Sequence, residues 1–299
     1  MIPDIALMQI FLTNTSKFTT GSVSELELDF LAQRSQTDEA LENITGWRDF
    51  TGEAMFQSKL RLQIRIDDFR ELQDNRNLSS KEQNEKLALD SLDFYTYTTR
   101  VLLDDLSNII IASNGSRTWR YLVTYKNMLR AIESLGIEIS YGIVFLGNGE
   151  LSPDDYANYI ETHFLCREYM LQSQSFISRM RESIATIMES DQYMQYTKRY
   201  QSLIQQTKDT RINDTASQSQ EIYNYFLNTF DVISMLRRSV ISLRLNMKDL
   251  IAEELEGIDR EFVLAIAIIV LLGITSPAIV MIIRNAVRGL QIFSDKLRQ

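Results

Sequence analysis

Apolar residues recur three and four positions apart over most of the chain, which is the spacing of amphipathic helices. The most regular run forms a heptad seam and consists of Leu122, Tyr125, Leu129, Ile132, Gly136, Ile139, Ile143 and Leu146. A second run of the same kind extends from Ile222 to Leu250. Both runs predict long helices that pack against neighbours along their length. At Gly136, a close approach of a neighbouring helix is favoured over room for a small ligand.

Turn and capping signals divide the remaining sequence into further helices. We expect helices over residues 24–47, 56–76, 87–112, 117–147, 153–189 and 191–207, and a last one from residue 217 onward. The clearest signal is the stretch GNGELSPDDY, in which Gly147 and Gly149 end one helix and Ser152 caps the next, with Pro153 at its first position. No proline interrupts the last helix before Pro277, so it extends for roughly 60 residues, or about 90 Å.

The stretch from Phe262 to Ile283 contains no charged residue. A bilayer core needs roughly 20 apolar residues in a helix, so this stretch predicts a membrane span. Acidic residues precede it, at Glu253, Glu254, Glu256, Asp259 and Glu261, and basic residues follow it, at Arg284, Arg288, Lys296 and Arg298. Because positive charge stays on the cytoplasmic side, we expect an extracellular domain at residues 1–261, a transmembrane helix at 262–283 and the start of a cytoplasmic segment at 284–299. The expected location is the plasma membrane.

The composition favours an all-α chain. Only three prolines and 11 glycines occur in 299 residues, and a single cysteine excludes an intrachain disulfide. The formal net charge of −9 argues against nucleic acid as a partner. Five N-glycosylation triplets precede the predicted span and fit an exported glycoprotein; they begin at Asn14, Asn43, Asn77, Asn114 and Asn213.

The first residues lack the basic and apolar regions of a signal peptide. Because an extracellular domain needs an export signal, we expect the natural chain to begin upstream of Met1, with a first membrane helix. We likewise expect it to continue beyond Gln299.

No catalytic constellation, phosphate-binding glycine loop or cofactor motif occurs in the sequence, so enzyme chemistry is not expected within this chain. His163 and Cys166 are spaced to present two metal ligands. With no matching ligands elsewhere, a packed cysteine beside a partly exposed histidine is favoured, and no metal is expected. Guanidinium groups inside a bundle are suited to binding an anion, with solvated helix faces as the favoured alternative for each one; the candidates are Arg34, Arg61, Arg65, Arg100 and Arg130.

Two stretches resemble the NIT domain, the nitrate- and nitrite-sensing domain. The stretch YKNMLRAIESLGIEISYGIVFLGNGELSPDDYANYI is similar to its core, in Glu133, Gly136, Glu138, Gly142, Phe145, Gly149, Leu151, Ser152 and Tyr156. The stretch LAQRSQTDEALENITGW is similar to an N-terminal motif of the family, in Leu31, Gln33, Arg34, Thr37, Asp38, Ala40, Leu41 and Trp47. The span and the triplets resemble most closely the animal receptor-type guanylate cyclases that carry this domain. The resemblance implies long antiparallel helices in two stacked four-helix bundles.

The family's anion-binding arginines do not carry over to this sequence. The L-Q-x-E-R-G run of its first helix is absent, and the arginine of its E-R-A motif corresponds to Ile139. The resemblance therefore leaves Arg34 as a candidate ligand residue, together with Glu138, Ser140 and Tyr141, which would suit a different small molecule or none.

The favoured function is extracellular sensing of a small molecule, such as a small anion, by a single-span receptor. Its signal would pass along the last helix to an output domain, which the resemblance implies to be a guanylate cyclase producing cyclic GMP. A homodimer is expected because a heptad-patterned helix entering a paired output domain works best as two. The alternatives are a bacterial-style chemoreceptor or sensor-kinase ectodomain and a structural or adhesive membrane glycoprotein without a ligand.

Overall fold

The computed structural model describes residues 31–32, 34–47, 53–74, 81–112, 118–205 and 215–298. Within these ranges, the side chains of residues 73–74, 81–88, 148, 215–220, 258, 267 and 270–298 are not described. All regular structure in the described part is helical, which confirms the predicted all-α class. After a helical segment at residues 34–42 the elements are η1 (Ala54–Phe56), α3 (Lys59–Asp74), α4 (Lys81–Ala112), α5 (Thr118–Asn148), α6 (Pro153–Ser173), α7 (Ser178–Met188), α8 (Asp191–Gln205) and α9 (Thr215–Arg298).

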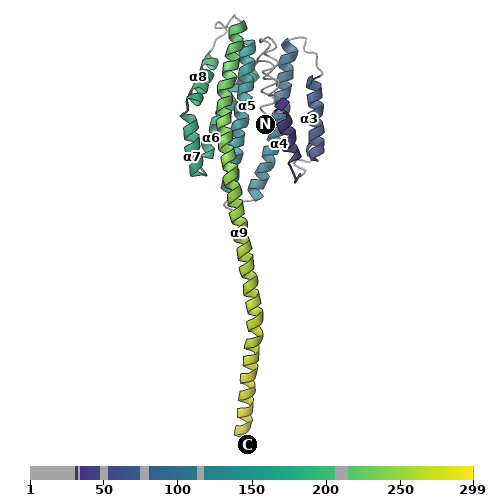
Figure 1. Cartoon of the computed structure of the whole chain (residues 1–299), viewed down its shortest axis with the longest axis vertical. Helices are drawn as coiled ribbons and strands as arrows, with labels where there is room; N and C mark the ends of the chain where they lie inside the picture. Colours follow the sequence, from purple (N-terminus) through teal and green to yellow (C-terminus); the bar gives the residue numbers. More distant parts are fainter. Residues whose placement is uncertain are drawn as a thin grey trace. The chain divides into compact units, whose positions relative to one another are not determined.

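The chain divides into two units, Met1–Leu245 and Asn246–Gln299. In the first unit the helices run side by side as a bundle (Figure 1). One large core cluster holds buried residues of α4 to α9, and a smaller cluster joins Leu41, Phe56, Leu62, Ile66 and Val101. The predicted arrangement as two stacked four-helix bundles stays a prediction.

Helix α5 lies at the centre of this packing. It packs against both α4 and α6, and the continuous run 131–136 is buried on every side of the helix, as is 138–144. The seam positions Ile132, Ile139 and Ile143 are buried as the heptad pattern predicts. The opposite side of the helix is buried as well, because neighbours cover it on more than one face.

The ring of Tyr225, on α9, packs against Gly142 of α5. A Cβ atom added at Gly142 would lie 2.3 Å from the hydroxyl of Tyr225, which is itself buried. The close helix approach expected at Gly136 stays a prediction. At Gly142, the end of the Tyr225 side chain leaves no room for a side chain larger than hydrogen.

Helix α6 begins as the sequence predicts. The Oγ atom of Ser152 accepts a hydrogen bond from the backbone N–H of Asp155 at 3.1 Å, and Pro153 occupies the first position. Gly149 has a φ of 78°, a conformation that favours glycine. The predicted continuous helix over 153–189 is wrong, because the chain turns at residues 174–176 and Ile177 takes an extended conformation before α7.

The remaining predicted helices agree with the structure to within a few residues at most of their described ends. Helix α3 covers the centre of the predicted range 56–76, and α4 ends at Ala112 as expected, although it begins six residues before the predicted start at Leu87. Helix α8 begins at Asp191 and ends two residues before the predicted end. The helix predicted over 24–47 lies partly outside the described residues, and its described part ends at residue 42.

Helix α9 is continuous from Thr215 to Arg298. It is uninterrupted up to Pro277, as predicted, and it continues beyond this proline. Its apolar seam in the first unit is buried, including Ile222, Phe226, Ile233 and Leu236.

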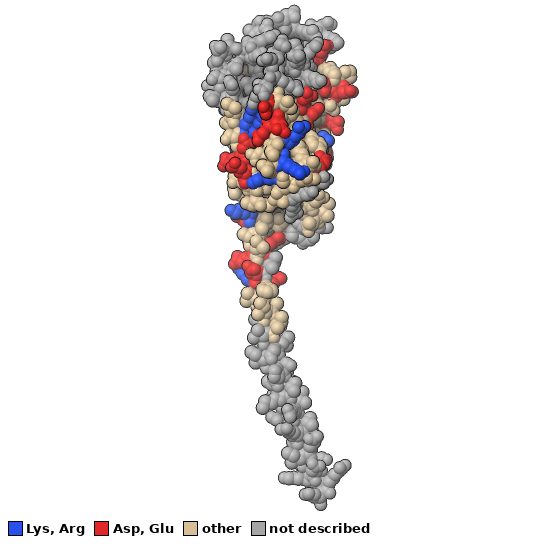
Figure 2. Space-filling model, turned by 90° about the vertical axis from the view of Figure 1, so that its right-hand side faces the viewer, with Lys and Arg blue, Asp and Glu red and all other residues tan. Residues whose placement is uncertain are grey.

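In the second unit the large side chains from Phe262 to Ile269 are exposed, and Figure 2 shows charged residues followed by an uncharged surface on this helix. Across the described residues, no helix is both long and apolar enough to cross a membrane. Most of the predicted span, 262–283, falls where side chains are not described, and it stays a prediction.

Candidate functional site

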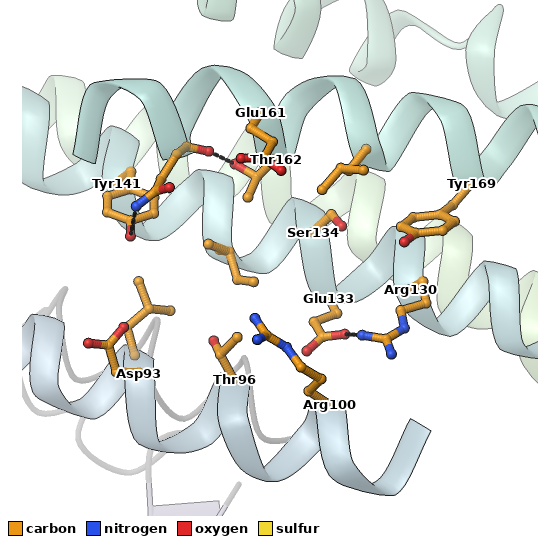
Figure 3. A pocket seen from close by; sticks show the side chains of 14 residues that line it. Asp93, Thr96, Arg100, Arg130, Glu133, Ser134, Tyr141, Glu161, Thr162 and Tyr169 are labelled. Atoms are coloured by element: carbon orange, nitrogen blue, oxygen red, sulfur yellow. Dashed lines mark hydrogen bonds and ion pairs between the residues drawn. The ribbon is translucent and has the colours of Figure 1, made fainter. Parts of the chain in front are cut away.

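A polar cavity of about 260 Å³ lies between α4, α5 and α6 in the first unit (Figure 3). Its lining consists of Leu92, Asp93, Thr96 and Arg100 from α4, of Arg130, Glu133, Ser134, Ile137 and Tyr141 from α5, and of Asn158, Glu161, Thr162, Leu165 and Tyr169 from α6. Within each helix these positions recur three or four residues apart, so each helix turns one polar stripe toward the others.

Two guanidinium groups enter the cavity from neighbouring helices. Arg130 donates to Asp104 Oδ1 at 2.6 Å through Nη2 and to Glu133 Oε2 at 3.3 Å through Nη1. Arg100 is directed toward the middle of the cavity in Figure 3, and its side chain forms no hydrogen bond or ion pair with the residues that the structure describes. Its five N–H donors can therefore serve a ligand, and a planar guanidinium is suited to two parallel hydrogen bonds with an oxyanion.

Glu133 is the most buried charged group of the cavity, with 4% of its surface exposed. Burial raises the pKa of its carboxyl, while the nearby charges of Arg130 and Arg100 act in the opposite direction. Its Oε2 atom is bound to Arg130, whereas Oε1 is buried without a hydrogen-bond partner among the described residues. A buried acceptor without a partner is costly, so this atom marks a place where a bound group would be stabilised.

The rim of the cavity carries further carboxylates and hydroxyl groups. Asp93 and Glu161 are exposed at its edge, and burial, followed by the charges of Asp90 and Asp155, raises the pKa of the Asp93 carboxyl. The Tyr141 hydroxyl accepts a hydrogen bond from Asn158 Nδ2 at 3.3 Å. The cavity is thus lined by both signs of charge and by neutral donors.

The structure does not gather the four predicted ligand residues around one cavity. Only Tyr141 lines the polar cavity. The Oγ atom of Ser140 donates to the carbonyl oxygen of Gly136 at 2.9 Å, as a buried hydroxyl inside a helix often does. Arg34 lies in the helical segment 34–42, where its carbonyl oxygen accepts from Arg70 at 3.4 Å.

Glu138 is buried in a different cluster, between α5, α6 and α8, in which His163 is half-buried. Its Oε2 atom accepts a hydrogen bond from the Tyr196 hydroxyl at 2.5 Å, and its Oε1 atom lies 3.3 Å from His163 Nδ1. The His163 ring stacks on Tyr200 at a centroid distance of 3.5 Å. This carboxyl is occupied by protein partners, so the ligand role predicted for Glu138, Ser140 and Arg34 stays a prediction without a shared cavity.

A second cavity, of about 360 Å³, has an apolar lining. It lies between residues 37–44, α4 and α5, and Leu102, Leu106 and Leu129 are among its walls. Glu133 borders this cavity as well as the polar one. The apolar cavity offers few polar groups to orient a ligand.

The other candidates of the sequence lie outside both cavities. Cys166 is buried with a raised thiol pKa, chiefly because of burial. The described residues hold no group of three or more His, Cys, Asp or Glu side chains placed to bind a metal ion. Arg61 and Arg65 are exposed on α3, which agrees with the solvated-face interpretation.

One glycosylation triplet falls among the described residues. Asn43 is exposed at the end of the helical segment 34–42. The other four, Asn14, Asn77, Asn114 and Asn213, lie outside the residues that the structure describes.

Sequence reasoning identified three of the cavity's residues, Arg100 and Arg130 among five arginine candidates and Tyr141 among four predicted ligand residues. It missed the cavity's other polar members. The missed signal is a stripe of polar side chains along one face of each of three helices. On α4 this stripe consists of Asp93, Thr96 and Arg100. Such a stripe is informative only when the helices that face one another are known.

A family model described as nitrate and nitrite sensing matches residues 10–238, more than two thirds of the sequence. Searches of curated proteins and of solved structures find no match.

Proposed function

The chain belongs to the family of nitrate and nitrite sensing domains, and we propose that it senses a small oxyanion bound in the polar cavity between α4, α5 and α6. The observation that carries this proposal is Arg100, whose guanidinium is directed into the cavity and has no hydrogen-bond or ion-pair partner among the described residues. Arg130 supplies a second guanidinium, from α5. Neither position is one that the family's known arginines occupy.

The proposal is tested by titrating nitrate into the purified full chain in a calorimeter. Replacing Arg100 by Gln removes a charged hydrogen-bond donor, which is worth about 1.5–3 kcal/mol, so affinity falls by roughly ten- to a hundredfold. Arg65→Gln is the matched control, because Arg65 is an exposed arginine of α3 outside the cavity. Equal affinities of the two variants would overturn the assignment of the site.

We further propose that the chain is anchored in the plasma membrane by residues 262–283, with the bundle outside the cell. The supports are the uncharged sequence of this stretch and the exposure of its first large side chains, such as Phe262 at 65% and Ile269 at 67%. A helix surface of this kind is stable when lipid or another protein covers it.

The proposed output is a guanylate cyclase, reached through α9 in a homodimer. The supports are the resemblance in the span and the heptad pattern of α9 before it. The test is cyclic GMP production by cells that express the natural transcript, with and without nitrate. A transcript that encodes no cyclase, or cyclic GMP that does not respond to nitrate while nitrate binds the purified chain, would contradict this output.

A further inference from the structure

The environment of Glu133 is unusual for a site that takes an anion. Its carboxyl sits between the two guanidinium groups of the polar cavity, with one oxygen bound to Arg130 and the other buried without a described partner (Figure 3). An ionised carboxylate offers acceptors only, as an oxyanion does. Two acceptors with negative charge in one cavity repel each other, so an oxyanion cannot occupy the space beside Oε1 favourably while Glu133 is ionised.

Carboxylates outnumber cations in the cavity and at its edge. From α4 come Arg100, Asp93 and Asp104, from α5 comes Arg130, and from α6 comes Glu161. Residues 37–44 contribute no titratable group to the described lining, which contains Thr37, Ala40, Leu41 and Ile44 from this segment. Tyr141 and Tyr169 add neutral phenols. With Glu133 ionised, the cavity and its edge therefore carry two cations and four carboxylates, Glu133 included.

We infer that the cavity binds an oxyanion together with one proton, which resides on Oε1 of Glu133 and is donated in a hydrogen bond to the anion. This inference rests on the proposed function of the cavity. On binding, solvent supplies the proton and a Glu133 O–H bond forms; on release, that bond breaks and the proton returns to solvent. Arg130 continues to donate to Oε2, and Arg100 donates to the anion from the other side. Burial independently favours the protonated carboxyl.

Proton uptake makes the sensor respond to pH as well as to the anion. Above the pKa that Glu133 has in the empty cavity, the affinity for nitrate falls about tenfold for each unit of pH. Nitrate carries no proton at these pH values, so any proton that enters with it is held by the protein.

The experiment is calorimetric titration of nitrate into the full chain between pH 5 and 8, in pairs of buffers whose protonation enthalpies differ. The expected result is an uptake of about one proton per nitrate near the upper end of this range, with affinity that weakens as pH rises. Glu133→Gln keeps an acceptor for Arg130 and a donor for the anion. This variant binds nitrate with an affinity that does not depend on pH and is tighter than that of the wild type at pH 8.

Glu182→Gln is the matched control, because Glu182 is an exposed carboxylate of α7 outside the cavity, and it retains the wild-type pH dependence. Nitrate binding by the wild type without proton uptake would overturn the inference and leave the proposed function standing. The absence of nitrate binding at every pH would overturn both. If the free amino acid glycine bound tightly and nitrate did not, the cavity would be a site for a zwitterion. That result would also overturn both the inference and the proposed function.

Discussion

Individual residues in this bundle are held by contacts that leave little freedom. Polar side chains occupy the centre, among them Glu138, Ser140 and Thr229, and each has a hydrogen bond to another residue. In a low-dielectric interior such bonds are required rather than optional. At this scale, two substitutions have outcomes that the geometry defines.

Gly142→Ala inserts a methyl group where the ring of Tyr225 already lies. The new Cβ would be 2.3 Å from the hydroxyl and 2.6 Å from Cζ of a ring that is buried and cannot swing away. Overpacking of this kind costs about 1–3 kcal/mol in the free energy of unfolding, which urea denaturation measures. Gly257→Ala is the control, because its Cβ has no neighbour within 4 Å, and it gains about 0.5–1 kcal/mol from the higher helix propensity of alanine. A G142A chain as stable as the wild type would show that α5 and α9 are not packed this closely.

Glu138→Gln alters the pH dependence of stability. Burial raises the pKa of the Glu138 carboxyl above its ordinary value of 4.5, although bonds to His163 and Tyr196 oppose the shift. The folded wild type therefore holds this proton to a higher pH than the unfolded chain does. The bound proton therefore stabilises the folded wild type. This stabilisation is complete below about pH 4.5 and is lost as the pH rises through the folded-state pKa of Glu138.

The amide of the E138Q variant cannot ionise, so the variant does not lose this stability as the pH rises. The free energy of unfolding of E138Q, relative to the wild type, rises across that window by up to about 1.4 kcal/mol per pH unit. Urea denaturation at a series of pH values measures it. Glu168→Gln, at an exposed position of α6, is the control, and its free energy of unfolding differs from that of the wild type by the same amount at every pH. If the difference for E138Q were also independent of pH, the raised pKa of Glu138 would be refuted.

At the scale of elements, local signals predict where most helices begin and end. The Ser152 cap, Pro153 and the glycine turn before them define the start of α6 in the sequence and in the structure alike. The break between α6 and α7 was not predicted, because residues 174–177 contain no proline or glycine and keep the apolar period of a helix. Helix α7 contacts both α6 and α8, and such tertiary packing is not visible in the sequence of one segment.

Ser152→Ala tests the importance of the cap. The hydroxyl oxygen accepts from the Asp155 N–H at 3.1 Å and donates to the Asp155 carboxylate at 2.6 Å. Its loss costs about 1 kcal/mol in the free energy of unfolding, measured by urea denaturation. Ser178→Ala is the matched control: Ser178 begins α7, where the capping position Ile177 makes no side-chain bond, and its change stays within about 0.5 kcal/mol. Equal effects of the two variants would mean that the cap is dispensable.

At the scale of the whole molecule, the sequence predicted the helical class and the family but not the site. Arginine identity alone could not separate Arg100 and Arg130 from Arg61 and Arg65, since all four lie on helices and Arg100 is exposed like Arg61 and Arg65. The separation depends on which helix faces meet. The predicted ligand residue Glu138 is buried as a core-facing position should be, but protein partners already satisfy it.

Membrane anchoring is tested on α9 itself. Ile269→Arg places a charge within the proposed span, at a cost of about 2.5–3.5 kcal/mol near the centre of a membrane helix. We expect a smaller share of the chain in the carbonate-resistant membrane fraction of expressing cells. Leu245→Arg, at an exposed position of the same helix before the span, leaves this share unchanged. Equal shares for both variants would contradict the proposed span.

The burial of α5 on all sides over residues 131–136 and 138–144 has a consequence for the order in which the bundle opens. A helix without a solvent-facing side cannot unfold alone, because every neighbour must move first. Its backbone amides between residues 131 and 144 should therefore be the slowest in the chain to exchange hydrogen for deuterium, and their rate should report global unfolding. Because the same helix carries Arg130 and Glu133, an anion bound beside them should slow that exchange throughout the first unit.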